Sequence, residues 1–198
     1  LKEDMKGDGH LNIPDGIITL NDKMFTKCVL DIKDIVIPQS VNSIETETFD
    51  NMTSLASFEV NSENKIFTTE NDALYSKDKN TLVRYPPGKT DESYVVSEGT
   101  TTIATHAFTK NSDVQKIILP KGFTTIENGA FDENYNDLLR IIPDTTITTK
   151  MDLFRDEAKD TPFDPTNDYA GKIEGSNGMF GLYVSAPLSD DKFLPGAN

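Results

Sequence analysis

The sequence predicts a β-rich solenoid, in which short strands coil around one long axis and successive turns stack on each other. Three observations lead to this prediction. The pattern Ile, four residues, Phe occurs as IETETF, IATHAF and IENGAF. The segments that contain these motifs follow each other, where the repeat is regular, after 23 or 24 residues. Short apolar runs precede them. A motif that recurs at a fixed period indicates a repeated structural unit, whereas a catalytic site is needed only once.

The strands are predicted from runs in which every second residue is apolar. In DIKDIVIP, Ile35 and Ile37 are two residues apart and therefore point to the same face of a strand. Val36 lies between them and is expected to point outward. The runs SLASFEV and DVQKIILP repeat this pattern. A proline then ends the strand, because it has no amide proton for the ladder and its φ is fixed.

Apolar residues follow each anchor at fixed offsets. In the first four copies these residues lie 3, 6 and 11 positions after the anchor. The last of them is always Phe, which we expect to follow a short helical or 3-10 turn and to plug the space between successive turns. A fifth copy runs from Pro143 to Phe154 but has Thr146 and Thr149 at its first two offsets. The anchors are Pro14, Pro38, Ser97 and Pro120, and the plugs are Phe25, Phe49, Phe108 and Phe131.

The period is interrupted over residues 61–93. Here ALYS and TLVRY flank the polar segment KDKN, a pattern typical of a β-hairpin. We expect this hairpin to project from an irregular coil. The domain prediction is a solenoid over residues 1–154, followed over residues 155–198 by a C-terminal cap or a linker. Within that last segment, MFGLYVSA is expected to form one strand.

A period of 20–29 residues is typical of leucine-rich-repeat solenoids. The predicted fold class is therefore an α/β-type leucine-rich-repeat solenoid that is rich in β-structure. It is expected to be a right-handed coil with short strands, short helical or 3-10 turns and one projecting β-hairpin.

The composition excludes several classes of protein. The net charge of −14 argues against nucleic acid and anionic membrane surfaces as partners, because both require a positive surface. No apolar stretch is long enough for a transmembrane helix, which needs about 18 residues or more. Cys28 is the single cysteine and is interpreted as a small apolar filler, so no internal disulfide is expected. Because the chain begins with Leu1, we expect a processed or engineered start from which any signal peptide has been removed.

No constellation of catalytic or metal-binding residues is found. His10 and His106 have no second His or Cys near them in the sequence and are expected to be exposed to solvent. Acidic residues such as Asp50 and Glu127 are expected to lie on a solvated convex face. The segment DENYND, residues 132–137, begins like a calcium-binding loop but lacks the required Gly and Glu, so incidental calcium binding and a simple turn remain alternatives. We therefore predict neither enzymatic activity nor a cofactor.

Two complete units, IVIPQSVNSIETETF and IILPKGFTTIENGAF, resemble the BspA-type leucine-rich repeat. The segment NDALYSKDKNTLVRYPPGK resembles a hairpin insert that is common in that family, in which Gly often occupies the place of Ala73. The resemblance covers about residues 10–154. It implies a secreted or surface-anchored bacterial protein, often a lipoprotein, that has no catalytic residues. It further implies a role in adhesion to host matrix proteins or in coaggregation.

The outward residues of the predicted strands form the candidate binding face, to which the hairpin adds two Tyr and one Arg. Ordinary packing of the tyrosines against the coil is the alternative. The first functional hypothesis is a surface-exposed adhesion module that binds a protein or glycan ligand on a host or neighbouring cell. A structural spacer or dimerising stalk is the second, and a solenoid accessory to a catalytic domain elsewhere is the third. The candidate ligand-binding residues are Lys33, Val36, Ser57, Glu59, Tyr75, Arg84, Tyr85, Lys116 and Ile118.

Overall fold

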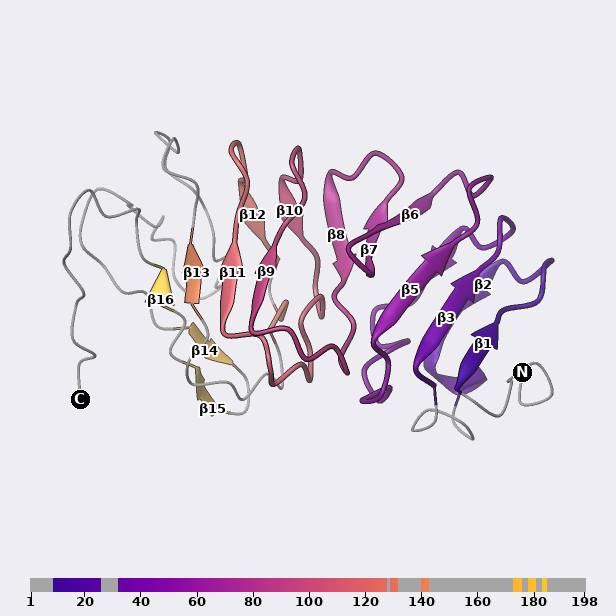
Figure 1. Cartoon of the computed structure of the whole chain (residues 1–198), viewed down its shortest axis with the longest axis horizontal. Helices are drawn as coiled ribbons and strands as arrows, with labels where there is room; N and C mark the ends of the chain where they lie inside the picture. The colour runs from indigo at the N-terminus through magenta and orange to yellow at the C-terminus, as the bar shows by residue number, and fades with distance from the viewer. Residues whose placement is uncertain are drawn as a thin grey trace.

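The protein is an elongated β-rich solenoid of about five turns (Figure 1). The computed structural model describes residues 9–25, 32–127, 129–131, 140–142, 173–175, 178–180 and 183–184. Within these residues the one helix is a 3-10 turn, η2 (Asp22–Met24). The α component of the predicted fold class is therefore wrong for the described part of the chain. At IETETF and IATHAF the backbone instead forms successive turns, in which an amide donates to the carbonyl three residues earlier.

Parallel strands run along one side of the solenoid, which we call the front ladder. They form two sheets, in the orders β1-β3-β5 and β16-β13-β11-β9. Neighbouring strands in each sheet are parallel and come from successive turns, except that β16 follows β13 only after the antiparallel pair β14–β15. The front strands are β1 (His10–Asn12), β3 (Asp34–Ile37), β5 (Ser57–Val60), β9 (Ser93–Val95), β11 (Lys116–Ile118), β13 (Arg140–Ile142) and β16 (Tyr183–Val184).

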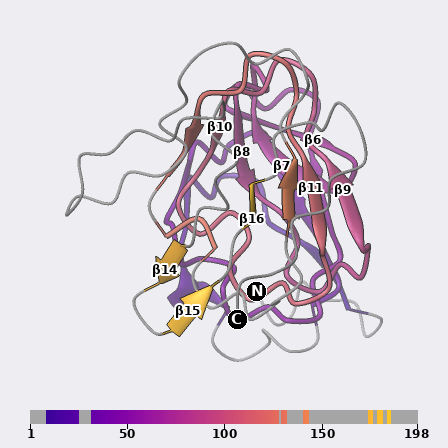
Figure 2. The ribbon, with the colours of Figure 1, turned by 90° about the vertical axis from the view of Figure 1, so that its left-hand side faces the viewer.

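A second set of strands, most of them only two residues long, forms a back ladder on the opposite side. Figure 2 looks along the solenoid and shows β9 and β11 on one side and β10 on the other. The predicted alternation is confirmed in the front ladder, where Ile35, Ile37 and Ile117 are fully buried and Val36 is only partly buried. The back strands are β2 (Thr19–Leu20), β4 (Ser43–Ile44), β8 (Thr81–Arg84), β10 (Thr102–Ile103) and β12 (Thr125–Ile126).

In the C-terminal segment the structure describes strands only. β14 (Ile173–Gly175) and β15 (Gly178–Phe180) form an antiparallel pair. β16 then pairs with β13 and extends the front ladder. The prediction that MFGLYVSA forms one strand is therefore wrong, because β15 and β16 are separate strands that belong to different sheets.

The hairpin predicted in the irregular coil is present, but it does not project. β6 (Phe67–Glu70), β7 (Ala73–Ser76) and β8 form antiparallel pairs, and β8 also pairs in parallel with β10 of the next turn. Ala73, Leu74 and Tyr75 are all fully buried, so both faces of β7 are covered. The prediction that the hairpin projects was wrong, because the hairpin lies inside the solenoid, between the turns that carry β5 and β9 (Figure 1).

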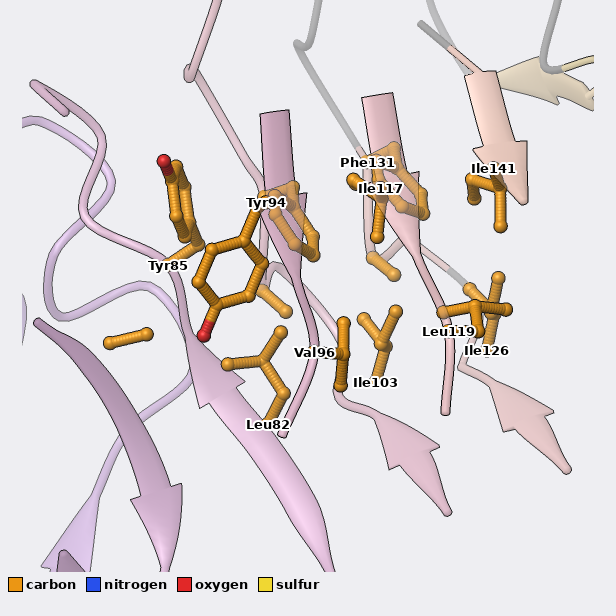
Figure 3. Packing of buried hydrophobic residues seen from close by; sticks show 14 of the residues in the cluster. Leu82, Tyr85, Tyr94, Val96, Ile103, Ile117, Leu119, Ile126, Phe131 and Ile141 are labelled. Atoms are coloured by element: carbon orange, nitrogen blue, oxygen red, sulfur yellow. The ribbon is translucent and has the colours of Figure 1, made fainter. Parts of the chain in front are cut away.

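The hairpin separates two hydrophobic cores. Successive residues of a strand point to opposite faces, and Leu74 accordingly belongs to one core while Ala73 and Tyr75 belong to the other. Leu82, on β8, packs into the same core as Tyr75, and its neighbour Val83 packs against the opposite core. We call the core that contains Leu74 the N-terminal core. The core that contains Tyr75 is the C-terminal core, which Figure 3 shows.

The predicted Phe plugs are buried in both cores. In the N-terminal core the rings of Phe25 and Phe49 have centroids 6.4 Å apart. In the C-terminal core Phe108 stacks on Phe131 at 5.1 Å and on Tyr85 at 5.2 Å. Tyr85 therefore takes the position of the plug in the turn that contains the hairpin. The plug prediction is confirmed within each core, and the hairpin divides the plugs into two groups.

Two buried asparagines, which the repeat pattern does not single out, join neighbouring turns. Asn64 Nδ2 donates to the carbonyl oxygen of Pro38 at 2.8 Å. Asn111 Nδ2 donates to the carbonyl oxygen of Lys89 at 2.8 Å, and its Oδ1 accepts from the amide of Val114 at 3.0 Å. Each asparagine thus satisfies backbone groups that are buried where the chain turns.

Candidate functional site

The outward residues of the front ladder lie at the surface, as expected. Lys33, Glu59 and Lys116 are exposed, while Val36, Ser57 and Ile118 are partly exposed. Parallel pairing holds these side chains in rows, because Val36 lies opposite Glu59. In the other front sheet, Ile118 lies opposite Val95, whose exposed fraction of 56% is high for an apolar residue. A binding role for the six outward residues stays a prediction.

The three hairpin residues chosen as surface anchors are buried. Tyr75 and Tyr85 have no exposed surface, and Arg84 is 2% exposed. The expected exposure was wrong because the hairpin is part of the sheet. The Tyr75 hydroxyl bonds to the Tyr94 hydroxyl at 2.6 Å. Burial, to which the neighbouring Tyr75 adds, raises the pKa of Tyr94 well above its ordinary value, and burial likewise raises the pKa of Tyr85. Packing, the alternative stated for the tyrosines, is what the structure shows.

Three charged or titratable side chains meet beneath the surface, and we call them the Asp50–Arg84–His106 cluster. Asp50 follows the plug of the second turn, Arg84 ends β8, and His106 lies in the turn after β10. Arg84 Nη1 donates to Asp50 Oδ1 at 3.0 Å and also to the His106 carbonyl oxygen. Asp50 Oδ2 lies 2.7 Å from His106 Nδ1. Arg84 Nη2 donates to the Thr109 carbonyl oxygen at 3.0 Å. The cluster therefore ties together turns on the two sides of the hairpin.

Burial dominates the electrostatics of the Asp50–Arg84–His106 cluster. Desolvation lowers the pKa of Arg84 to about 10, although the charge of Asp50 and its hydrogen bond act in the opposite direction. Among the described residues, the Arg84 Nε atom has no hydrogen-bond partner. The expected solvent exposure of Asp50 and His106 was wrong, since Asp50 is 8% exposed and the His106 side chain is 20% exposed. The guanidinium of Arg84 holds the Asp50 carboxylate and the His106 carbonyl oxygen, and the Asp50 carboxylate in turn pairs with the His106 ring.

Other candidate chemistry is limited in the described residues. They contain no group of three or more His, Cys, Asp or Glu that could hold a metal ion. His10, the second histidine, pairs through Nδ1 with Asp34 of the neighbouring strand. Cys28 and the calcium-like segment 132–137 lie outside the described residues.

Where the chain is described, no helix combines the length and the apolar composition that are needed to cross a lipid bilayer.

The repeat and the fold are shared with known proteins. The model of the BspA type Leucine rich repeat region, in six copies, matches residues 8–90 and 88–159. No curated protein matches the chain. Among solved structures, a leucine-rich repeat protein from Eubacterium ventriosum is 29% identical with a TM-score of 0.59, over 67% of this chain and 35% of that one. A leucine rich cell surface protein from Faecalibacterium prausnitzii is 23% identical with a TM-score of 0.52, over 68% and 41% of the two chains.

A third similar structure is the pneumococcal vaccine antigen PcpA. It is 31% identical with a TM-score of 0.46, over 56% of this chain and 29% of that one. The chain thus spans less than half the length of each of these three proteins. The family match covers more than half of the chain and includes every strand from β1 to β13. The chain belongs to the BspA-type leucine-rich-repeat family.

Proposed function

We propose that the chain is a non-enzymatic binding module on a bacterial cell surface. The front ladder presents its outward side chains to a protein or glycan ligand on a host or neighbouring cell. Membership of a family that is generally non-catalytic supports this proposal. The similar protein from F. prausnitzii is described as a cell surface protein, which supports the proposed location.

The observation that carries the proposal is the contrast between buried and exposed polar groups. Asp50, Arg84 and His106 are bonded to each other and hold neighbouring turns together. The exposed charges Lys33 and Lys116 instead stand on or beside strands whose backbones are fixed by parallel pairing. A solenoid of this kind provides an extended and rigid surface for recognition. Rigid presentation lowers the entropic cost of binding, because little ordering is needed on the side of the module.

The test is a binding assay with two matched variants. The front variant carries Lys33→Ala, Glu59→Ala and Lys116→Ala, all on exposed residues of the front ladder. The control variant changes the same residue types at exposed positions in turns. Its substitutions are Glu47→Ala, Lys65→Ala and Lys121→Ala.

Both variants and the wild-type chain would be titrated against immobilised matrix glycoproteins and mucin. We expect saturable binding that the front variant weakens by about tenfold or more, which corresponds to about 1.4 kcal/mol. The control variant is expected to bind like the wild type. Equal losses in both variants, or no binding across the panel, would contradict the proposal.

Light scattering distinguishes the binding module from a dimerising stalk. For the binding module we expect light scattering to give the molar mass of a monomer, 22.0 kDa. A stable dimer that the front variant dissociates would mean that the front ladder joins two copies of the chain, and the stalk would then be the better description.

A further inference from the structure

The front ladder is interrupted between β5 and β9. Its first sheet ends at β5 and its second sheet begins at β9, because the hairpin lies between the two turns (Figure 1). Among the strands that the structure describes, β9 therefore pairs only with β11, on one of its two sides. An edge strand presents a row of amides and carbonyls that can pair with another extended chain.

The hydrogen bonds of β9 show which backbone groups face the open side. Lys116 donates to the carbonyl oxygen of Glu92 at 3.1 Å, and Val96 donates to the carbonyl oxygen of Ile118 at 2.9 Å. The backbone groups of the even-numbered residues, such as Glu92 and Val96, thus point toward β11. Because the backbone groups of successive residues in a strand point to alternate sides, those of Ser93 and Val95 point to the open edge. The side chains of both residues are exposed.

The opposite edge, on β5, is already covered. Phe58 points its amide away from β3, and this amide donates to the carbonyl oxygen of Asp72 at 2.9 Å. The Leu55 carbonyl oxygen, just before β5, accepts from the amide of Gly88 at 2.7 Å. The hairpin and the loop after it thus close the edge of β5. On the edge of β9 the amide of Ser97, just after the strand, donates to the Tyr75 hydroxyl at 3.3 Å. The backbone groups of Ser93 and Val95 are those that remain, within the described part of the chain, for an additional strand.

The open edge is held in a fixed shape from inside. Tyr94 lies between Ser93 and Val95 and points into the C-terminal core. Its hydroxyl bonds to Tyr75 at 2.6 Å, and its ring lies 4.6 Å from that of Tyr85 (Figure 3). The backbone of β9 is therefore formed before any partner arrives, which favours the addition of a strand.

Charge around the edge selects among extended partners. Residues 91–98 contain three acidic side chains and no basic one. Asp91, Glu92 and Glu98 are all exposed, but Asp91 is paired with Lys89 at 3.1 Å, and Lys116 lies opposite Ser93 on the closed side of β9. The acidic side chains of this segment that form no ion pair with another described residue are therefore Glu92 and Glu98. The chain as a whole has a net charge of −14, so the wider field has the same sign. A cationic segment is attracted to this edge, whereas an acidic segment is repelled.

We propose that the open edge of β9 binds an extended segment of a partner protein that is rich in Lys or Arg, which adds as a strand beside β9. The incoming backbone pairs with Ser93 and Val95, and its basic side chains lie near Glu92 and Glu98. This inference deepens the proposed function, on which it rests, since it selects a protein ligand over a glycan. It extends the front ladder into the interruption that the hairpin creates.

Amide hydrogen exchange tests the pairing directly on the full chain. The probe is a capped decapeptide of alternating Lys and Val, added at increasing concentration. In the free protein the Val95 amide is expected to exchange rapidly, while the Tyr94 amide is protected by β11. Saturation with the probe is expected to slow exchange at Val95 by about tenfold or more and to leave Tyr94 unchanged. Unchanged exchange at Val95 in the presence of saturating probe would overturn the proposal.

Two control peptides separate backbone pairing from charge. The first is the same decapeptide with every second amide methylated, which removes its donors on one edge and keeps its charge. The second alternates Glu and Val. Both are expected to bind at least about tenfold more weakly than the Lys–Val peptide. Binding of the methylated peptide at full strength would show attraction by charge alone and would overturn strand addition.

Variants of the edge separate this inference from the proposed function. Val95→Pro removes the outward amide, and Val95→Thr is its matched control, because Thr keeps both the amide and a β-branched side chain. Glu92→Lys combined with Glu98→Lys, at two exposed positions, tests the charge without altering the strand. Val95→Pro and the double variant are each expected to weaken probe binding by about tenfold or more. If the front variant loses ligand binding while these variants retain probe binding, the edge proposal fails and the proposed function stands.

Discussion

Replacing Arg84 with Met tests whether the Asp50–Arg84–His106 cluster holds the turns together across the hairpin. The substitution keeps most of the length and apolar stem of the side chain but removes its charge and its donors. It leaves Asp50 Oδ1 and the Thr109 carbonyl oxygen without the bonds of 3.0 Å that the guanidinium makes to each. The donation to the His106 carbonyl oxygen is lost as well.

The expected loss of stability follows from the burial of these groups. Arg84 is 2% exposed and Asp50 is 8% exposed, so solvent screens their interaction little. Removing one partner of a buried ion pair destabilises a protein by about 3–5 kcal/mol, because the other charge remains buried and unpaired. We expect Arg84→Met to fall in this range. The whole free energy of unfolding of a domain is about 5–15 kcal/mol, so the change is easily measured.

The pKa of Arg84 predicts how the double variant behaves. Desolvation lowers that pKa to about 10, which means that burial disfavours the charged guanidinium more strongly than Asp50 favours it. Replacing both partners by apolar residues removes the desolvation penalty together with the attraction. We therefore expect Asp50→Leu with Arg84→Met to lose clearly less stability than the sum of the two single losses, with a coupling energy of about 0.5–3 kcal/mol.

Urea unfolding followed by circular dichroism measures the four members of this cycle. Lys79→Met is the matched control, because Lys79 pairs with Glu70 near the surface and its side chain is 43% exposed. The control is expected to lose less than about 1 kcal/mol. If Arg84→Met loses no more than Lys79→Met, or if the two single losses simply add, the cluster does not act as a tie between turns.

Three further substitutions test the packing of turns, each by the shift of the unfolding midpoint. Gly88→Ala would place a methyl group 2.5 Å from the backbone carbon of Ser54, so we expect a loss of about 1–3 kcal/mol; an unchanged midpoint would show that the loop can move away. Asn111→Ala leaves buried backbone groups without partners, among them the Lys89 carbonyl oxygen, and is expected to cost about 1–3 kcal/mol for each. Phe108→Ala empties the centre of an aromatic stack and is expected to lower the free energy of unfolding by about 3–5 kcal/mol. A loss of less than about 1 kcal/mol would contradict the role of Phe108 as a plug.

The regular turns were predictable because their signals are local. Two apolar residues two positions apart, such as Ile35 and Ile37, fix the inner face of a strand wherever the strand lies. The Phe at the end of each unit lies at the same position relative to the anchor in every one of the first four copies, so its burial could be inferred from the period alone. The hairpin was also predictable as a pair of strands, since KDKN supplies the residues of a turn.

The position of the hairpin was missed although the sequence contained a signal for it. Ala73, Leu74 and Tyr75 are three consecutive apolar residues, and a continuous apolar run is typical of a strand that is buried on both faces. A hairpin that projects into solvent would need polar residues on one face. The exposure assigned to Tyr75 and Tyr85 failed for the same reason.

No local pattern predicts the Asp50–Arg84–His106 cluster. Asp50 and Arg84 are separated by 34 residues, and Arg84 and His106 by 22. The first of these intervals crosses the interrupted period, so the register between the turns could not be derived from the repeat. Arg84 reaches the turn that contains His106 because β8 pairs with β10, whereas no element of the repeat places Asp50 beside them.

The strand shared by the two cores bears on how the protein unfolds. In a regular solenoid each turn is stabilised by its immediate neighbours, so local opening can spread from one turn to the next. At β7 such opening meets a strand whose Leu74 face and Tyr75 face belong to different cores. When the turns on one side of the hairpin unfold, one face of β7 is uncovered. The other face of β7 and its antiparallel partners, β6 and β8, still hold the strand. The hairpin therefore marks a boundary of cooperativity that the Asp50–Arg84–His106 cluster bridges, and we expect the turns on its two sides to melt as separate units once Arg84 is replaced.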